Sequence, residues 1–176
     1  NLVVTSSEQL KEYVNKLLTY YTSDNLIVSK TRFPLADLIS EINQIVNANN
    51  EAEIVTDFDG NLEIITDKTA LSQILINIIS NGIKYNTTDK PIIKITNNIV
   101  NFKSNISISD NGIGIDTQNF ETIFQNNKTL SKKDRYGNYG TGLGLAIVMN
   151  LTQKIDFDIK VSSEIGKGST FTLMEK

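Results

Sequence analysis

The sequence predicts a single α/β domain with a short helical appendage at its N-terminus. The chain has 176 residues, which is enough for one such domain but not for two full ones. Apolar residues at helical spacing alternate along the chain with short runs typical of strands. With 39% hydrophobic and 21% charged residues, ten glycines and two prolines, the composition is typical of a folded, soluble chain.

The composition also argues against several classes of function. The net charge of −3 gives no basic surface for nucleic acid, and no apolar run approaches the roughly 20 residues that span a bilayer. Because the chain contains no cysteine and no histidine, it offers no disulfide, no thiolate or HExxH zinc site and no Ser-His-Asp triad. It starts at Asn1 without a basic and apolar leader, which indicates a fragment or a processed chain rather than a signal peptide.

The first predicted element is a helix over residues 6–21. Its apolar residues recur at steps of seven, four, three and four, the spacing of a heptad seam on a partner helix: Val3, Leu10, Val14, Leu17 and Tyr21. An amphipathic helix packed on the domain's own core gives the same short pattern. Two incomplete heptads leave both interpretations open.

Strands and helices alternate in the middle of the chain. A strand starts at residues 26–28 and precedes a helix with apolar residues at Leu35, Leu38, Ile39, Ile42 and Val46. Residues 53–56 and 62–66 flank a turn-rich loop and predict an antiparallel hairpin. Asp67 is placed to cap the next helix, which extends to about Tyr85.

The last third of the chain contains two pairs of strands and a polar segment. Strands are predicted over residues 92–96 and 99–109, and again over 157–162 and 169–173, after a helix that begins near Gly142. Residues 116–139 are polar and carry few apolar anchors, which is typical of a mobile functional loop. We call residues 116–139 the lid.

Three polar residues share one face of the helix that ends near Tyr85. Asn77, Asn81 and Lys84 are four and three residues apart, which places them within about 60° of one another. The other side of this helix is Leu and Ile, so the polar face would meet a cavity or another polar group. Amide oxygens suit Mg²⁺ and lysine suits phosphate, while an exposed helix face is the alternative interpretation.

A glycine-bearing loop follows the strand that ends at Asp110. The segment Asp110-Asn111-Gly112-Ile113-Gly114-Ile115 begins with a carboxylate on the strand face that also carries Ile106 and Ile108. Such a carboxylate can accept a hydrogen bond from the exocyclic amine of a base, and glycines let the backbone approach a ligand. Asp-Asn-Gly is also a good hairpin turn, so both interpretations stay open here.

A second glycine-rich segment, Gly140-Thr141-Gly142-Leu143-Gly144-Leu145, lies where a loop becomes a helix. Free backbone N–H groups and the positive end of the helix dipole favour phosphate binding at such a place. The segment does not fit the Rossmann fingerprint, because no strand precedes it closely, and the chain contains no GxxxxGK[ST] motif.

The order of these motifs is more specific than any one of them. They follow one another as Asn77-xxx-Asn81-xx-Lys84-Tyr85, Asp110-x-Gly112-x-Gly114, Ile123-Phe124, Gly140-x-Gly142-x-Gly144 and Gly166-x-Gly168-Ser169-Thr170-Phe171. From about residue 33 to residue 176, this order resembles the catalytic ATP-binding domain of bacterial sensor histidine kinases. These belong to the GHKL superfamily, together with gyrase, the mismatch-repair ATPase and the large heat-shock chaperone.

The resemblance implies an α+β two-layer sandwich, in which a Bergerat-type mixed β-sheet is covered on one face by helices and carries a flexible ATP lid. It divides the chain into two parts. Residues 1–25 would be the remnant of a dimerisation or phosphotransfer helix and its linker, and residues 26–176 the ATP-binding catalytic domain.

The resemblance also implies roles for single residues in binding ATP and Mg²⁺. Asn81 would ligate Mg²⁺, Asn77 and Lys84 would support the phosphates and the metal, and Tyr85 would lie against the nucleotide. Asp110 would bind the adenine amine, with Thr170 in the same polar network. Phe124 would hinge the lid, whose lysines and arginine would balance triphosphate charge. The remaining contacts would come from the glycine loops, at Gly112, Gly114, Ile115, Gly140, Thr141, Gly142, Leu143 and Gly144.

The implied activity is that of an ATP-dependent protein-histidine kinase that transfers the γ-phosphoryl group to a histidine outside this chain. No residue is assigned as catalytic beyond the ATP site, and the fragment alone is expected not to autophosphorylate because it has no histidine. The expected partners are the dimerisation and histidine phosphotransfer domain of a homodimeric parent and a response regulator. The expected location is cytoplasmic, without contact of this fragment with nucleic acid or membrane.

Two alternatives stay open. One is an anti-sigma serine kinase of the same superfamily, against which the heptad-bearing first helix argues. The other is a non-catalytic nucleotide-sensing or interaction module. It is favoured by Asn127, which stands three residues after Phe124 where kinase lids usually carry a second aromatic residue.

Overall fold

The structure is a computed structural model that describes residues 27–101, 103–130 and 132–176. The helix predicted over residues 6–21 therefore lies outside the described residues, and its heptad interpretation stays a prediction. Within the described ranges, no helix has both the length and the apolar character that crossing a bilayer requires.

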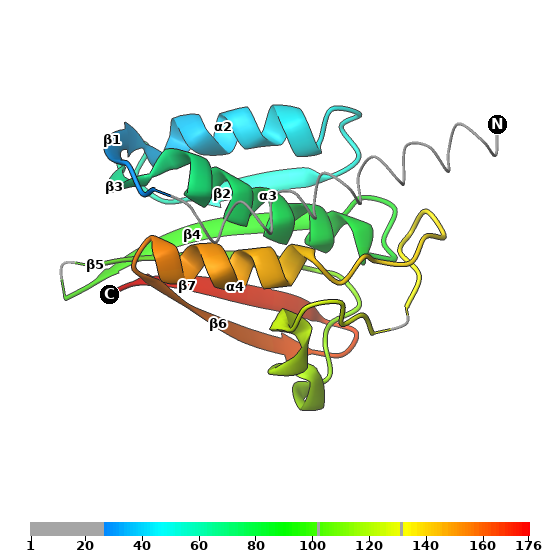
Figure 1. The fold of residues 1–176 in the computed structure, drawn as a ribbon. Coiled ribbons are helices and arrows are strands. Elements are labelled where there is room, and N and C mark those ends of the chain that lie inside the picture. The colour runs from blue at the N-terminus through cyan, green and yellow to red at the C-terminus, as the bar shows by residue number, and fades with distance from the viewer. Residues whose placement is uncertain (1–26, 102, 131) are drawn as a thin grey trace.

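The centre of the domain is a five-stranded mixed sheet (Figure 1), which confirms the predicted fold class. Its strand order is β2 (Glu53–Asp57), β4 (Ile92–Val100), β5 (Lys103–Asp110), β7 (Gly168–Glu175) and β6 (Phe157–Glu164). Strand β2 runs parallel to β4, and the other three pairs are antiparallel. Strands β1 (Lys30–Pro34) and β3 (Glu63–Asp67) form a separate antiparallel ribbon.

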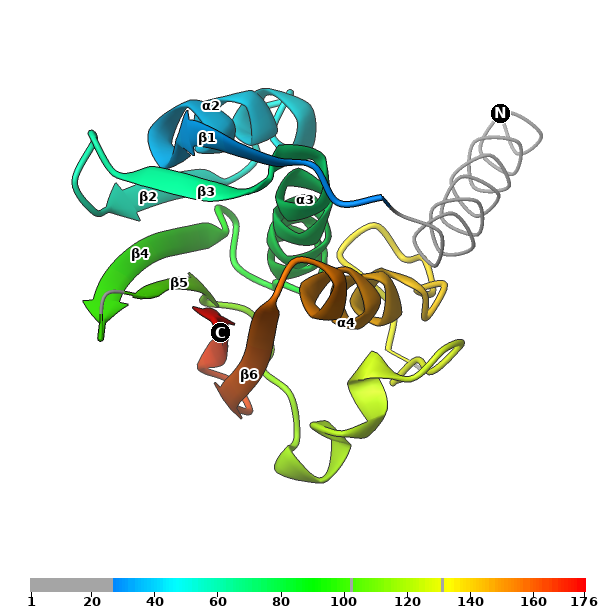
Figure 2. The same cartoon turned by 60° about the vertical axis from the view of Figure 1, so that its left-hand side comes forward.

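Three helices lie on one face of this sheet: α2 (Leu35–Val46), α3 (Lys68–Lys84) and α4 (Gly144–Lys154). Figure 2 shows α3 and α4 on the same side of β4, β5 and β6. The core lies between the two layers and includes fully buried side chains from helices and strands alike: Leu71, Ile74, Leu75, Ile79, Ile93, Ile95, Ile106 and Ile108. The opposite face of the sheet carries hydroxyl pairs such as Ser107 with Thr172. This division follows from the period of two along each strand.

Helix α3 begins and ends as the sequence predicts. The Asp67 carboxylate accepts a hydrogen bond of 2.9 Å from the backbone N–H of Ala70, so it caps the helix. The last helical residue is Lys84, and Tyr85 forms the C-cap.

Three predictions about strands are wrong. The first strand does not start at residues 26–28, because β1 begins at Lys30 and continues through Phe33 to Pro34. Residues 53–56 and 62–66 do not form a hairpin, because β2 pairs with β4 in the large sheet while β3 pairs with β1 in the small one. The second predicted strand does not begin at Ile99, because Ile99 and Val100 continue β4. The chain reverses at Asn101 (φ 53°), since asparagine tolerates the left-handed conformation better than its neighbours do.

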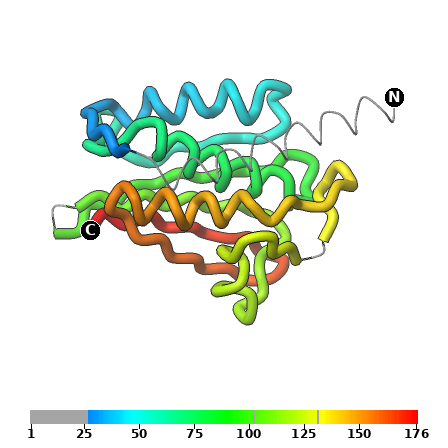
Figure 3. Tube along the Cα trace, viewed as in Figure 1, coloured from blue at the N-terminus to red at the C-terminus, as the bar shows by residue number. Residues whose placement is uncertain are grey.

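The predicted site motifs meet at one end of the molecule, as the tube in Figure 3 shows. The end of α3, the end of β5 and the start of α4 lie there, together with the lid. The first part of the lid forms two short 3₁₀ turns, η1 (Thr117–Asn119) and η2 (Thr122–Phe124). The two-layer core thus holds segments from distant parts of the chain around one cavity.

Candidate functional site

A cavity of about 890 Å³ lies between α3, the end of β5, the lid and the start of α4. A volume of this size is typical of a pocket for a small organic ligand. Of the fifteen predicted site residues, ten line it: Asn81, Lys84, Tyr85, Asp110, Gly114, Ile115, Gly140, Thr141, Gly142 and Gly144. The other five, Asn77, Gly112, Phe124, Leu143 and Thr170, do not line it.

The polar face of α3 points into the domain and is not an exposed helix face. Asn77 is only 5% exposed, and its amide nitrogen donates to the backbone carbonyl of Gln73 at 2.9 Å. Its Oδ1 faces the start of α4, 3.1 Å from where a Cβ on Gly144 would lie. Asn81 and Lys84, one and two turns further on, line the cavity. The helix therefore presents amide and ammonium groups to a ligand.

Asp110 ends β5 with its carboxylate at the cavity. Its Oδ1 accepts hydrogen bonds from the backbone N–H groups of Gly112 at 2.8 Å and Ser169 at 3.3 Å. Its Oδ2 receives no hydrogen bond from the described residues, so this oxygen can accept one from a ligand. Burial raises the pKa of Asp110 above its ordinary value, and the two N–H donors oppose this rise. A part-buried acceptor of this kind suits an amine on a base.

The loop after Asp110 passes close to the end of α3. The backbone N–H of Ile113 donates to the carbonyl of Tyr85 at 3.1 Å. A Cβ on Gly112 would lie only 2.5 Å from the same carbonyl oxygen, so this close approach requires glycine. Gly112 therefore acts by bringing the backbone to α3 and does not itself line the cavity.

The second glycine-rich segment runs along the cavity into the first turn of α4. Leu143 is buried in the core at 2% exposure, while Gly142 and Gly144 on either side line the cavity. No side chain caps this helix. The N–H groups of its first turn are thus free of a side-chain acceptor, as an anion-binding helix end requires.

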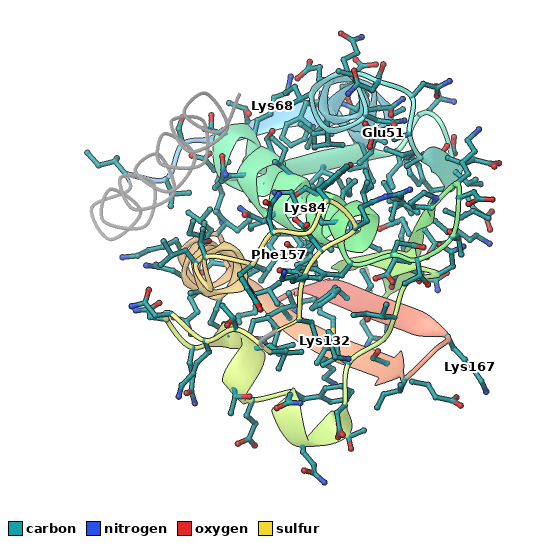
Figure 4. The ribbon with its side chains drawn as sticks, turned by 90° about the vertical axis from the view of Figure 1, so that its right-hand side faces the viewer. Glu51, Lys68, Lys84, Lys132, Phe157 and Lys167 are labelled. Atoms are coloured by element: carbon teal, nitrogen blue, oxygen red, sulfur yellow. The ribbon has the colours of Figure 1, made fainter. Side chains whose placement is uncertain are left out.

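The lid cations divide into two pairs, which the sequence alone does not distinguish. Lys128 and Lys132 line the cavity; Figure 4 labels Lys132 together with Lys84 of α3. Lys133 instead lies over the ring of Tyr139, 5.5 Å from its centre. The guanidinium of Arg135 points away to the carbonyls of Thr88 at 3.4 Å and Asp89 at 3.3 Å. Lys128 and Lys132 are therefore the lid cations that can meet a ligand's charge.

Contacts with the body of the domain hold the tip of the lid. The backbone N–H of Arg135 donates to the carbonyl of Lys84 at 2.9 Å. The Tyr136 hydroxyl donates to the carboxylate of Glu51, just before β2. This hydrogen bond lowers the pKa of Glu51, and burial followed by the same bond raises that of Tyr136 to about 12. The tip of the lid thus rests on the end of α3 and on the segment before β2.

The base of the lid is fixed by packing and by one backbone bond. Phe124 packs edge-to-face on Phe171, with 6.4 Å between ring centres. It supports the lid from the core side. Asn127 has a left-handed backbone (φ 58°), and its N–H donates to the carbonyl of Gly142 at 3.1 Å. Asn127 is therefore a turn residue that joins the middle of the lid to the second glycine-rich segment.

Thr170 is not part of the Asp110 network, contrary to the expectation. Its hydroxyl pairs with that of Ser109 at 2.8 Å, on the face of the sheet opposite to the cavity. The residue that reaches Asp110 is Ser169, through its backbone, and Ser169 and Phe171 both line the cavity. The alternation of side chains along β7 could have predicted that Ser169 and Phe171 lie on the cavity side, because Ser169 shares a strand face with the apolar Phe171 and Leu173.

The residues present fit a divalent cation held mainly by a ligand. The described part of the chain contains no group of three or more acidic, histidine or cysteine side chains that could hold a metal. Asn81 lines the cavity, and its side chain carries an amide oxygen. Such a set fits Mg²⁺, which is usually bound through one or two protein oxygens together with phosphates and water.

Comparisons with known proteins agree with this geometry. The family described as "Histidine kinase-, DNA gyrase B-, and HSP90-like ATPase" matches residues 66–175. The autoinducer 2 sensor kinase/phosphatase LuxQ of Vibrio parahaemolyticus is 32% identical over 185 residues, which cover 96% of this chain and 21% of LuxQ. The chain thus spans about a fifth of the length of that relative.

Solved structures have the same fold. The crystal structure of full-length ShkA in complex with AMPPNP superposes with a TM-score of 0.78 at 22% identity, covering 97% of this chain and 36% of ShkA. The Acinetobacter baumannii histidine kinase AdeS gives 0.77 at 23% identity, covering 98% of this chain and 81% of AdeS. The cavity, the motifs in their order and these matches lead to one conclusion: the chain belongs to the family of histidine kinase-, DNA gyrase B- and HSP90-like ATPases, as an ATP-binding domain of the sensor histidine kinase type.

Proposed function

We propose that this chain binds ATP with Mg²⁺ and supplies the γ-phosphoryl group to a histidine outside it, as the catalytic domain of a two-component sensor kinase. The observation that carries the proposal is Asp110, a part-buried carboxylate at the cavity whose Oδ2 receives no bond from the described residues. The exocyclic amine of adenine can donate a hydrogen bond to such an oxygen.

The rest of the cavity suits the phosphates. Asn81 would hold Mg²⁺, which when bound neutralises phosphate charge and orients the γ-phosphoryl group. Asn77 and Lys84 would support this side of the site, Tyr85 would lie against the nucleotide, and the start of α4 would receive phosphate oxygens. Lys128 and Lys132 would face the phosphates from the lid.

The reaction would be an in-line transfer between two macromolecular parts. A neutral imidazole nitrogen attacks the γ-phosphorus, the bond from that phosphorus to the β,γ-bridging oxygen breaks, and ADP leaves while the imidazole loses its N–H proton to water. This chain contributes position and charge stabilisation rather than the nucleophile, since it contains no histidine.

The wider organisation belongs to the same proposal. Residues 1–25 would be the end of a dimerisation helix and its linker, and residues 26–176 the catalytic domain. The partners would be the dimerisation and histidine phosphotransfer domain of a homodimeric parent and a response regulator, in the cytoplasm. Support comes from the relatives, which are named sensor kinases.

Nucleotide titration tests the proposal. ATP should bind more tightly with Mg²⁺ than without it, and at least about tenfold more tightly than GTP, because GTP carries a carbonyl where adenine carries the amine. With γ-labelled ATP, label should then appear on a supplied dimerisation domain and not on a variant without its histidine. Equal affinity for ATP and GTP would contradict the base assignment. Binding without transfer would favour a nucleotide-sensing module.

A further inference from the structure

Two asparagines form a part-buried hydrogen-bonded pair at the loop that begins with Asp110. Asn86 follows the C-cap of α3 and is only 2% exposed, and Asn111 is the residue after Asp110. The amide nitrogen of Asn86 donates to Oδ1 of Asn111 at 2.7 Å. The pair therefore joins the end of α3 to the loop that begins with Asp110.

Backbone donors fix the direction of this bond. Oδ1 of Asn86 accepts from the backbone N–H of Thr88 at 2.9 Å, and Oδ1 of Asn111 accepts from the backbone N–H of Ile92 at 2.9 Å. Because a backbone N–H can only donate, each amide must turn its oxygen toward it. Asn86 is then the donor to Asn111, which acts in these bonds only as an acceptor.

We propose that Asn86 and Asn111 are positioning residues that hold the Asp110 carboxylate in register with α3, and thereby set the preference of the site for an amine-bearing base. This inference rests on the proposed function. Asp110 itself is held by the N–H groups of Gly112 and Ser169, and its side chain packs beside Gly82 of α3. The Ile113–Tyr85 backbone bond ties its loop to the end of α3 alongside the amide pair. Loss of the amide pair would let the loop move relative to the base.

The direction of the bond predicts an asymmetry between two isosteric variants. Asn111→Asp keeps an acceptor for both Asn86 and Ile92, so the pair survives. Asn86→Asp turns a carboxylate oxygen toward Oδ1 of Asn111, where two acceptors repel each other. Both variants add one negative charge near Asp110, so charge alone cannot explain a difference between them.

The measurement is the ratio of the dissociation constants of purine riboside triphosphate, which lacks the exocyclic amine, and ATP. Partial unfolding weakens both apparent affinities by the same factor, so the ratio reports the base site and not the stability. We expect a ratio of about ten or more for the parent chain and for Asn111→Asp, and about two or less for Asn86→Asp and Asn111→Ala.

Asn47→Ala is the matched control. Asn47 makes a similar part-buried amide pair with the backbone of Ala52, through bonds of 2.9 and 3.0 Å, and neither residue lines the cavity. It should lower stability and leave the ratio unchanged. If Asn86→Asp does not fold, Asn111→Ala at the less buried position still decides.

Two results would overturn the inference, and they are distinguishable. A large ratio in the parent that persists in Asn86→Asp and Asn111→Ala would show that the pair is only structural, while the proposed function stands. A parent ratio near one would remove the role of Asp110 in base recognition, and this inference with it.

Discussion

The hydroxyl of Tyr85 lies where a side chain on Gly140 would begin. A Cβ added to Gly140 would collide with this oxygen, whereas the ring carbon that carries it would stay at 3.7 Å, an ordinary contact. Burial and the charge of Asp134 raise the pKa of Tyr85, so the group is a neutral phenol near pH 7. The C-cap residue of α3 and the start of the second glycine-rich segment are therefore in direct contact.

This contact predicts a coupled pair of mutations. Gly140→Ala should weaken ATP binding several-fold, because the new methyl group must displace either Tyr85 or the loop. In a Tyr85→Phe background the same change should cost little, so the two mutations should be non-additive by about 1 kcal/mol. Calorimetric titration of the four proteins measures this coupling. Gly60→Ala, at a site with open space, is the control, and strictly additive losses would refute the contact.

Asp110→Asn should bind ATP about tenfold more weakly, because an amide N–H₂ then faces the adenine amine; the expected cost is about 1–3 kcal/mol. The same variant should be more stable at pH 7. Burial raises the pKa of Asp110 above 3.8, so the folded state holds its proton more tightly and loses stability as pH rises through the window above 3.8. Thermal melts from pH 4 to 7 should show a smaller decline in the variant. Unchanged affinity in a folded variant would make Asp110 a turn residue only.

Asn81→Ala should reduce ATP binding more in the presence of Mg²⁺ than in its absence, since it removes an oxygen ligand from the metal side of the cavity. The loss of magnesium-dependent affinity should be about tenfold, with little change in EDTA. Asn81→Asp keeps an oxygen at this position and should retain the dependence on Mg²⁺. Equal losses with and without metal would assign Asn81 a purely structural role.

The lid should be protected by a triphosphate. Proteolysis between Lys128 and Arg135 should slow several-fold with a non-hydrolysable ATP analogue and Mg²⁺, and slow less with ADP, because Lys128 and Lys132 face the cavity. Equal protection by both nucleotides would rule out contact between the lid and the γ-phosphate.

Two adjacent lysines of the lid provide a matched comparison. Lys132→Ala should weaken the binding of ATP about threefold to tenfold more than the binding of ADP, because Lys132 lines the cavity. Lys133→Ala should change neither affinity, because Lys133 lies over the ring of Tyr139. Titrations with both nucleotides give the two ratios. The same ATP-to-ADP ratio in both variants would contradict the division of the lid cations.

Local signals explain what could be predicted at the level of elements. Asp67 caps α3 because its short side chain directly precedes an apolar run of helical period, where it can accept a hydrogen bond from a free backbone N–H of the first turn. The pairing of β2 with β4 carried no such signal. Two short strands beside a turn-rich loop favour a hairpin locally, and only the competition among all strands for partners separates them.

The sequence by itself determined the motifs, their order and therefore the family, because spacing along a helix or strand fixes which side chains share a face. Tertiary structure decided which of those side chains reach the cavity. In the folded chain Lys132 lines the cavity, whereas the guanidinium of Arg135 contacts Thr88. Ser169 rather than Thr170 lies beside Asp110, and Asn86 is hydrogen-bonded to Asn111. These choices depend on hydrogen bonds between segments up to 59 residues apart, whose partners exist only once the two layers have packed.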